Sequence, residues 1–133
     1  MNVVIVGCGR VGARVATILD QGGHRVSIVD TDSSAFRRLP QDFGGNAVIG
    51  IGIDEDVLKS AGIEDADAFF SVTNGDNTNI MAAQLAQKVF EVKHVCARIY
   101  DPVREETYRR MGIVTVCPTT TIASLMLSTL TDS

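Results

Sequence analysis

The chain has 133 residues, of which 45% are hydrophobic, and a formal net charge of −4 with a pI near 5.0. This length and hydrophobic content predict one domain with a core of its own, and the acidic balance disfavours a protein that binds nucleic acid or anionic lipid. No apolar run approaches the roughly 20 residues of a spanning helix and no basic leader precedes Val3, so we expect a cytoplasmic protein without direct membrane insertion.

Apolar runs of strand length alternate with segments of helical periodicity along the chain. Each run is almost continuously apolar, as expected of strands buried on both faces of a parallel sheet. The predicted strands are Val3–Val6, Val26–Val29, Ala47–Ile49, Ala68–Val72, Val95–Ile99 and Ile113–Val116. With right-handed crossovers, the alternation predicts an α/β fold: a Rossmann-like, doubly wound parallel six-stranded sheet of order 3-2-1-4-5-6.

Helices are expected between these strands. The first helix ends at Gly22–Gly23, which supplies a left-handed stop, and its predicted apolar face consists of Val11, Val15, Ile18 and Leu19. Aspartates are typical N-caps. They are predicted to start three later helices: Asp54 before Glu55–Ala61, Asp76 before Asn77–Phe90, and Asp101 before Pro102.

A glycine-rich loop, GCGRVG, connects the first strand to the first helix. In a Rossmann-like unit, Gly7 permits the tight turn, Gly9 lets a pyrophosphate approach the backbone, and Gly12 lets helix and strand pack closely. Unpaired N–H groups at the start of the helix favour an anion there. The predicted loop contacts are Gly7, Cys8, Gly9, Arg10, Val11 and Gly12. A purely structural glycine turn is the alternative.

Two side chains refine the expected ligand. Asp30, followed by Thr31, ends the second strand, where a carboxylate accepts hydrogen bonds from ribose hydroxyls and repels a 2′-phosphate. We therefore expect an adenine nucleotide without that phosphate, so NADP is disfavoured. Arg10 has two interpretations: a guanidinium that grips a di- or triphosphate, or a solvated arginine on the first helical turn.

Ligands of such sheets bind at the carboxyl ends of the strands. Further predicted contacts at that edge are Gly50, Ile51, Thr73, Asn74 and Arg98. Each has a structural alternative: Thr73 and Asn74 shape the turn before Asp76, and Arg98 pairs with an acid such as Asp101.

The last predicted helix, residues 118–130, has more apolar surface than one stripe. Its apolar positions are Ile122, Leu125, Met126, Leu127 and Leu130. A helix of this kind requires cover on more than one side, so a second subunit is the expected partner. The alternative is a helix docked entirely on its own sheet.

Catalysis is the competing interpretation: the chain would be the cofactor-binding domain of an NAD-dependent oxidoreductase whose substrate domain lies elsewhere. His24 and His94 precede strands and are therefore expected at the amino edge, away from the ligand. The Tyr-x-x-x-Lys pattern is absent. The cysteines, Cys8, Cys96 and Cys117, lie far apart beside apolar residues, which predicts reduced thiols and no metal. A purely structural interaction domain would leave the glycine loop unexplained.

Several strings resemble one known family, the TrkA N-terminal domain, also called the RCK domain. They are GCGRVG, VD at residues 29–30, EDVLKSAGIEDADAFFSVTNGDNTNI at 55–80, ARIYDP at 97–102 and GIVTVCP at 112–118. The resemblance covers nearly the whole chain, 1–133, as a single domain. GIEDADAFFSVTNGDNTN is its most specific part, because generic dinucleotide-binding domains share the glycine loop and lack that string.

The resemblance implies a non-enzymatic regulatory subunit of bacterial potassium uptake systems or channels. In the family, Gly7, Gly9, Arg10 and Gly12 would hold the phosphates and Asp30 the ribose. It implies NAD(H) in the TrkA type or ADP/ATP in the KtrA type. It also implies a homodimer or ring whose final helix crosses to a neighbouring subunit, and a cytoplasmic location at the inner face of the membrane through a transporter partner.

Two features depart from the family pattern. The family usually has Gly-Asp after the third strand, where this chain has Gly50-Ile51, so a polar contact to the adenosine is expected to be lost. Family proteins also normally carry a second, C-terminal ligand-binding domain, and this sequence ends at Ser133. The sequence leaves open whether it is part of a longer protein.

Overall fold

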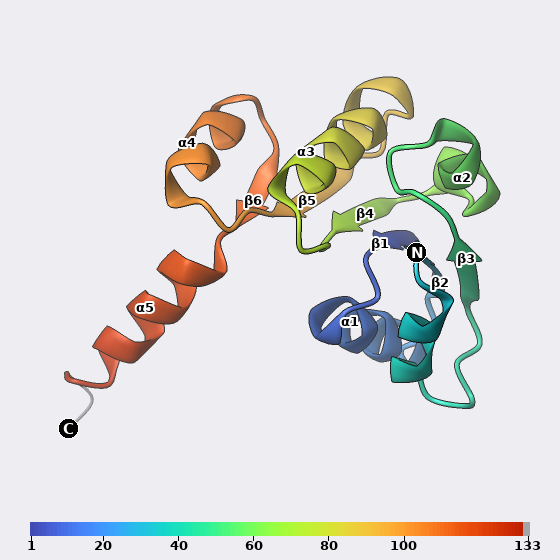
Figure 1. The fold of residues 1–133 in the computed structure, drawn as a ribbon, viewed down its shortest axis with the longest axis horizontal. Helices are drawn as coiled ribbons and strands as arrows, with labels where there is room; N and C mark the ends of the chain where they lie inside the picture. The colour runs from blue at the N-terminus through green and yellow to red at the C-terminus, as the bar shows by residue number, and fades with distance from the viewer. Residues whose placement is uncertain (132–133) are drawn as a thin grey trace.

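The computed structural model describes residues 1–131, and its strands form one parallel sheet of order β3-β2-β1-β4-β5-β6 (Figure 1). The strands are β1 (Asn2–Val6), β2 (Arg25–Asp30), β3 (Asn46–Ile49), β4 (Ala68–Ser71), β5 (His94–Arg98) and β6 (Val114–Val116). Both the predicted doubly wound sheet and its strand order are confirmed.

The sheet is buried on both faces at its centre. Along β1, Val3 and Ile5 join one apolar cluster with Ala16 of the first helix, whereas Val4 and Val6 join a second cluster on the other face. Successive side chains of a strand point to opposite faces, so the unbroken apolar run of β1 fills both layers. In Figure 1, α1 lies on one side of the sheet, and α2 and α3 lie on the other.

The helical segments alternate with the strands. They are α1 (Arg10–Gln21), η1 (Ser33–Arg38), α2 (Glu55–Ser60), η2 (Ile63–Asp65), α3 (Asp76–Gln84), the π-helical η3 (Leu85–Val89), α4 (Pro102–Arg110) and α5 (Pro118–Ser128). Two predicted N-caps are confirmed: Asp54 accepts a hydrogen bond from Asp56 N at 2.8 Å, and Asp101 accepts one from Val103 N at 3.0 Å.

Two helix predictions require correction. Gly12, Ala13 and Ala16 form the buried face of α1, while Val11 and Ile18 of the predicted apolar face are 48% and 55% exposed. Small residues face the sheet because the helix approaches β1 closely. Asp76 is the first residue of α3 and does not cap it; Gly75 is the N-cap.

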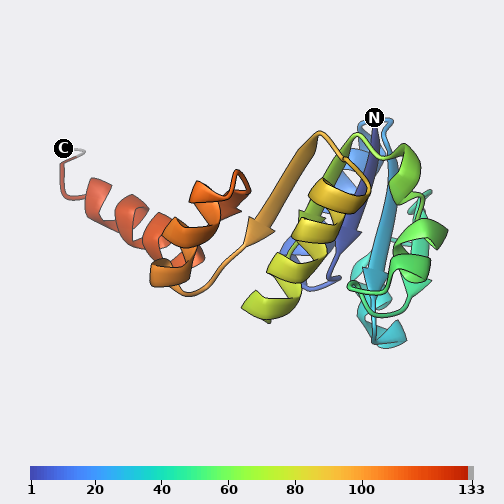
Figure 2. The ribbon, with the colours of Figure 1, turned by 90° about the horizontal axis from the view of Figure 1, so that it is seen from above.

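Helix α5 projects beyond β6 and α4, away from the sheet (Figures 1 and 2). None of its residues is buried, and Leu125, Met126 and Leu127 are each more than 60% exposed. Docking of this helix on its own sheet, the alternative left open by the sequence, is therefore contradicted. Across residues 1–131, no helix combines the length and apolar character needed to cross a bilayer.

Candidate functional site

A cavity of about 450 Å³ opens at the carboxyl edge of the sheet. Its walls come from the glycine loop, the end of β2, the segment after β3, and the turn between β4 and α3. The predicted site residues in its lining are Gly7, Cys8, Gly9, Asp30, Thr31, Gly50, Ile51, Thr73 and Asn74. The fold thus brings together residues that are up to 67 positions apart in sequence (7 to 74).

Each of the three loop positions has a different structural reason for glycine. Gly7 has a φ of +111°, and a Cβ there would lie 2.9 Å from Thr73 N. A Cβ on Gly12 would lie 1.8 Å from the carbonyl oxygen of Gly7, so this glycine sets the close packing of α1 on β1. At Gly9 a Cβ would meet no atom within 4 Å, which leaves room for a ligand beside the backbone.

Gly9, the N-cap of α1, lines this space, and no side chain caps the helix. The first N–H groups of a helix have no intrahelical acceptor and carry the positive end of its dipole. Together with the open position at Gly9, they form the type of backbone site that binds phosphate.

Asp30 stabilises the loop from the end of β2. One carboxylate oxygen accepts a hydrogen bond from Cys8 N at 2.8 Å, and the other accepts one from Asp32 N at 2.9 Å. A carboxylate has about four acceptor positions, so capacity remains for the two hydroxyls of a ribose.

Cys8 of the loop is fully buried, although it belongs to the cavity lining. Its thiol donates a weak hydrogen bond to Ala35 O at 3.4 Å. Burial, followed by the negative charge of Asp30, raises the pKa of Cys8 to about 11. The thiol therefore stays protonated at neutral pH.

Sequence reasoning missed Arg38 and Asp32. Both line the cavity, and Arg38 donates to Cys8 O at 3.4 Å. The Ser34 hydroxyl, followed by the Ser34 backbone N–H, lowers the pKa of Asp32, which caps η1. One sequence signal was available: Asp32-Ser33-Ser34 is a typical start of a helical turn. A turn that starts there would have Arg38 at its end.

Four predicted site residues lie outside the cavity lining: Arg10, Val11, Gly12 and Arg98. Arg10 is exposed and lines a separate groove with Arg14 and Arg38. Arg98 donates to Val72 O at 2.6 Å and to Thr73 O at 3.0 Å, which fixes the end of β4. Its guanidinium also lies 4.9 Å from the centre of the Tyr100 ring, in place of the predicted alternative pairing with Asp101.

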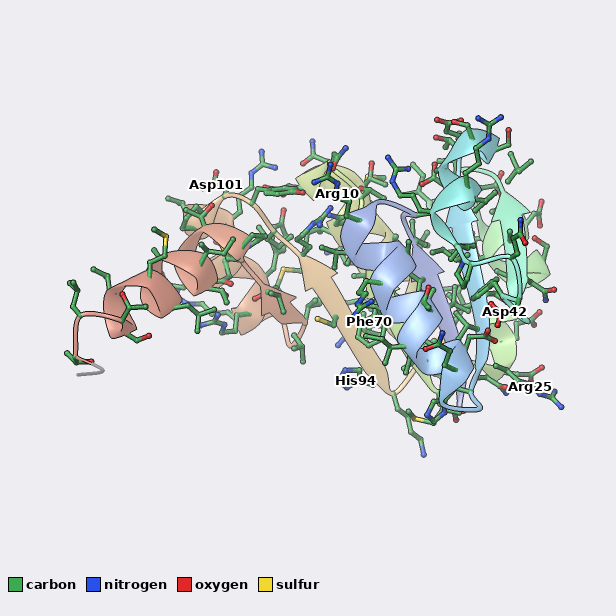
Figure 3. All side chains as sticks on the ribbon, turned by 90° about the horizontal axis from the view of Figure 1, so that it is seen from below. Arg10, Arg25, Asp42, Phe70, His94 and Asp101 are labelled. Atoms are coloured by element: carbon green, nitrogen blue, oxygen red, sulfur yellow. The ribbon has the colours of Figure 1, made fainter. Side chains whose placement is uncertain are left out.

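The two histidines lie at the opposite edge. His94 begins β5, and His24, which precedes β2, has Nδ1 3.0 Å from the N-terminal amine. In Figure 3, Arg10 and Asp101 lie at one edge of the sheet, and His94 and Arg25 lie at the other. Within residues 1–131, no group of three or more His, Cys, Asp or Glu side chains is placed to hold a metal ion.

A cavity of about 470 Å³ also lies at that amino edge. Its lining mixes acids and bases, including Asp20, Arg25, Lys59 and Asp65. It includes no residue of the 7–12 glycine loop and not the N-terminus of α1. The carboxyl-edge cavity is therefore the better candidate for an anionic ligand.

Known proteins are similar to this chain in sequence. A sequence model of the TrkA-N domain family matches residues 3–119. The Trk system potassium uptake protein TrkA of Streptomyces coelicolor is 52% identical over 133 residues, which are 100% of this chain and 60% of that protein. A TrkA homolog of Pyrococcus abyssi is 32% identical over 111 residues, 84% of this chain and 49% of that protein. The chain thus spans less than two thirds of these relatives.

Solved structures share the fold. The Kef CTD of Shewanella denitrificans in its AMP-bound form has a TM-score of 0.81 at 25% identity, covering 98% of this chain and 80% of that chain. The GsuK channel bound to NAD has a TM-score of 0.71 at 19% identity, covering 86% of this chain and 21% of that chain. The second likeness is one of fold alone.

Proposed function

The chain belongs to the TrkA-N domain family, and we propose that it binds an adenine nucleotide, NAD(H) or ADP/ATP, in the cavity at the carboxyl edge of its sheet. The diphosphate lies against the first turn of α1 at Gly9, and the ribose hydroxyls bond Asp30. One observation carries this proposal: the uncapped start of α1 and the carboxylate of Asp30 line or border the same 450 Å³ cavity.

The Kef CTD supports the nucleotide class, because that structure is in an AMP-bound form and is 25% identical in sequence to this chain where the two align. The charge of Asp30 disfavours a 2′-phosphate, so NADP binds more weakly than NAD. Ile51, which is 55% exposed and lines the cavity, offers apolar contact only, where the family's usual aspartate would offer a polar one.

The relatives named above are potassium uptake proteins. We propose that this chain is the nucleotide-sensing part of such a system, and that it acts from the cytoplasmic side on a membrane potassium transporter or channel subunit. Regulation requires the nucleotide to bind two subunit arrangements with unequal affinity, because equal affinity shifts no equilibrium. Helix α5 is the proposed contact in a homodimer or larger ring.

The chain is proposed to bind the nucleotide without catalysing its reaction. Hydride transfer requires a positioned proton donor, most often histidine. The lining that the structure describes contains no histidine, lysine or tyrosine. Consumption of NADH with a small carbonyl compound would count against this part of the proposal.

A thermal-shift panel with NAD, NADH, NADP, ADP, ATP and AMP tests the binding. A bound nucleotide at 100 times its Kd should stabilise the chain by about 2.7 kcal/mol.

Asp30→Ala should weaken the binding of every adenosine ligand. Asp42→Ala, which changes an exposed loop residue, should weaken the binding of none. Arg10→Ala should affect ADP and ATP more than AMP. No stabilisation by any of the six compounds would contradict the proposal.

A further inference from the structure

The turn between β4 and α3 lines the candidate nucleotide cavity and is also bonded to the far half of the sheet. Thr73, Asn74, Gly75 and Thr78 belong to the lining. Asp76 and Asn79 of the same GDNTN string lie outside the lining. Their side chains bond the end of β5 and the segment that follows it.

Asn79 holds this turn to the end of β5 from inside the protein. Its side chain is fully buried, and Oδ1 accepts hydrogen bonds from Thr73 N at 2.8 Å and Thr73 Oγ1 at 2.7 Å. Its Nδ2 donates to Thr73 O at 3.0 Å and to Arg98 O at 2.9 Å. A buried amide with four partners fixes its neighbours to one another.

Asp76 makes the next connection. Its two carboxylate oxygens accept from two consecutive backbone N–H groups in the β5–α4 connection, Tyr100 N at 2.7 Å and Asp101 N at 3.1 Å. Asp76 directly follows Gly75 of the cavity lining and is not itself in that lining. A displacement of the turn therefore moves the carboxylate that holds the β5–α4 connection.

The β5–α4 connection is bonded in turn to the base of α5. Tyr100 O accepts from Thr119 Oγ1 at 3.4 Å and from Cys117 Sγ at 3.6 Å. Ile99 N donates to Val116 O at 3.0 Å, just before α5 begins. Hydrogen bonds, joined by short stretches of backbone, thus link the cavity wall to the first turn of the projecting helix.

We propose that Asp76 is a positioning residue that couples nucleotide occupancy of the cavity to the orientation of α5. The inference rests on the proposed function, because it requires a nucleotide at the β4–α3 turn. The turn, the β5–α4 connection and the base of α5 move as one bonded unit, and Asp76 is its central bond. A static scaffold would contain the same bonds and would not respond to nucleotide, and experiment separates the two.

Peptide-resolved hydrogen exchange of this chain, with and without saturating ADP or NAD, tests the coupling. Nucleotide should slow exchange in residues 7–12, which reports binding, and should change exchange in residues 117–121 by at least about threefold. Asp76→Asn keeps the shape of the side chain and replaces one acceptor oxygen with a donor. It should retain the effect at 7–12 and lose more than half of the effect at 117–121.

Asp67→Asn is the matched control, because Asp67 also accepts from a backbone N–H, that of Asn2 at 2.8 Å, at the amino edge. It should respond like the unchanged chain at both segments. Thr119→Val removes a hydroxyl bond to Tyr100 O from an exposed position, and gives a second variant should Asp76→Asn not fold. It should reduce the response at 117–121 and leave the response at 7–12 intact.

The outcomes separate the two proposals. Nucleotide effects at 7–12 with none at 117–121, or an undiminished effect at 117–121 in Asp76→Asn, overturn the coupling and leave nucleotide binding in place. An absence of nucleotide effects at 7–12 overturns the proposed function and the coupling with it.

Discussion

Three backbone positions and one carboxylate define the candidate site at the scale of single residues. Gly7 is required by the packing of the loop against the β4–α3 turn, and Gly12 by the packing of α1 on the loop, because a side chain at either position would collide with backbone atoms. Gly9 is not required by packing. Asp30 holds the loop through Cys8 N. The loop is thus preformed, and among its three glycines only Gly9 has room for a Cβ.

Gly12→Ala should therefore affect mainly the stability of the chain, whereas Gly9→Ala should affect mainly nucleotide binding. A Cβ at Gly12 would meet the Gly7 carbonyl oxygen at 1.8 Å, so Gly12→Ala should lower the free energy of unfolding by about 3 kcal/mol or more. Gly9→Ala should cost at most about 1 kcal/mol and weaken nucleotide binding at least about tenfold, or 1.4 kcal/mol. Urea unfolding and calorimetric titration measure the two effects. If the Gly9→Ala variant bound nucleotide with unchanged affinity, the phosphates would not lie beside Gly9.

The buried thiol of Cys8 predicts a pH dependence. Its folded-state pKa of about 11 lies above the reference value of 9.0, so between these values the unfolded chain loses a proton that the folded chain retains. The free energy of unfolding should thus be unaffected by Cys8 below pH 9 and should fall by about 2–3 kcal/mol as the pH rises toward 11. Urea unfolding across this range should show a shallower fall for Cys8→Ala. Parallel curves for the two chains would contradict the burial of an uncharged thiol.

The glycine loop and Asp30 could be found from sequence because their spacing follows directly from one strand–turn–helix unit. Arg38 could not be placed in the same way. It lies at the end of η1, a short 3₁₀ segment without apolar periodicity. Arg98 was assigned to the correct sheet edge, but sequence does not show that its guanidinium turns to the carbonyls of Val72 and Thr73.

At the scale of elements, the β4–α3 turn connects the two halves of the molecule. Strand positions followed from sequence because each strand is an apolar run of the expected length. Strand order followed from the alternation of strands and helices with right-handed crossovers. The helix start at Asp76 did not, because an aspartate before a helix has the same appearance whether it caps that helix or bonds another segment. Here the carboxylate bonds Tyr100 N and Asp101 N, residues 24 and 25 positions away.

Removal of the buried amide should destabilise this connection. Asn79→Ala leaves Thr73 N and Arg98 O without their partner in the interior, so the free energy of unfolding should fall by about 2–4 kcal/mol. Asn77 is the matched control: it is exposed and its side chain accepts from Arg104 at 2.8 Å. Asn77→Ala should cost less than about 1 kcal/mol in the same urea titration. Equal losses would show that the Asn79 network contributes nothing beyond surface contacts.

At the scale of the whole molecule, the projecting α5 leaves an apolar surface without cover. Ile122, Leu125, Met126, Leu127 and Leu130 are each at least 55% exposed. The sequence predicted this excess of apolar surface. It could not predict the direction in which the helix leaves β6, since that depends on the backbone at Cys117 and on the bonds to Tyr100 O.

Substitutions on α5 should change the oligomeric state. We expect the unchanged chain to self-associate through this helix, and Leu125→Ser combined with Ile122→Ser to weaken the association at least about tenfold. Ile18→Ser, which changes a residue of α1 that is 55% exposed, serves as the control. Sedimentation velocity over a concentration series measures all three chains. A monomeric unchanged chain would contradict the proposed role of α5.

A crystal structure of this chain with the nucleotide that stabilises it most tests the central claim most directly. We predict a diphosphate within hydrogen-bond distance of the backbone N–H groups that follow Gly9, and ribose hydroxyls on the carboxylate of Asp30. A nucleotide bound at any other place, with the carboxyl-edge cavity left empty, would contradict the account.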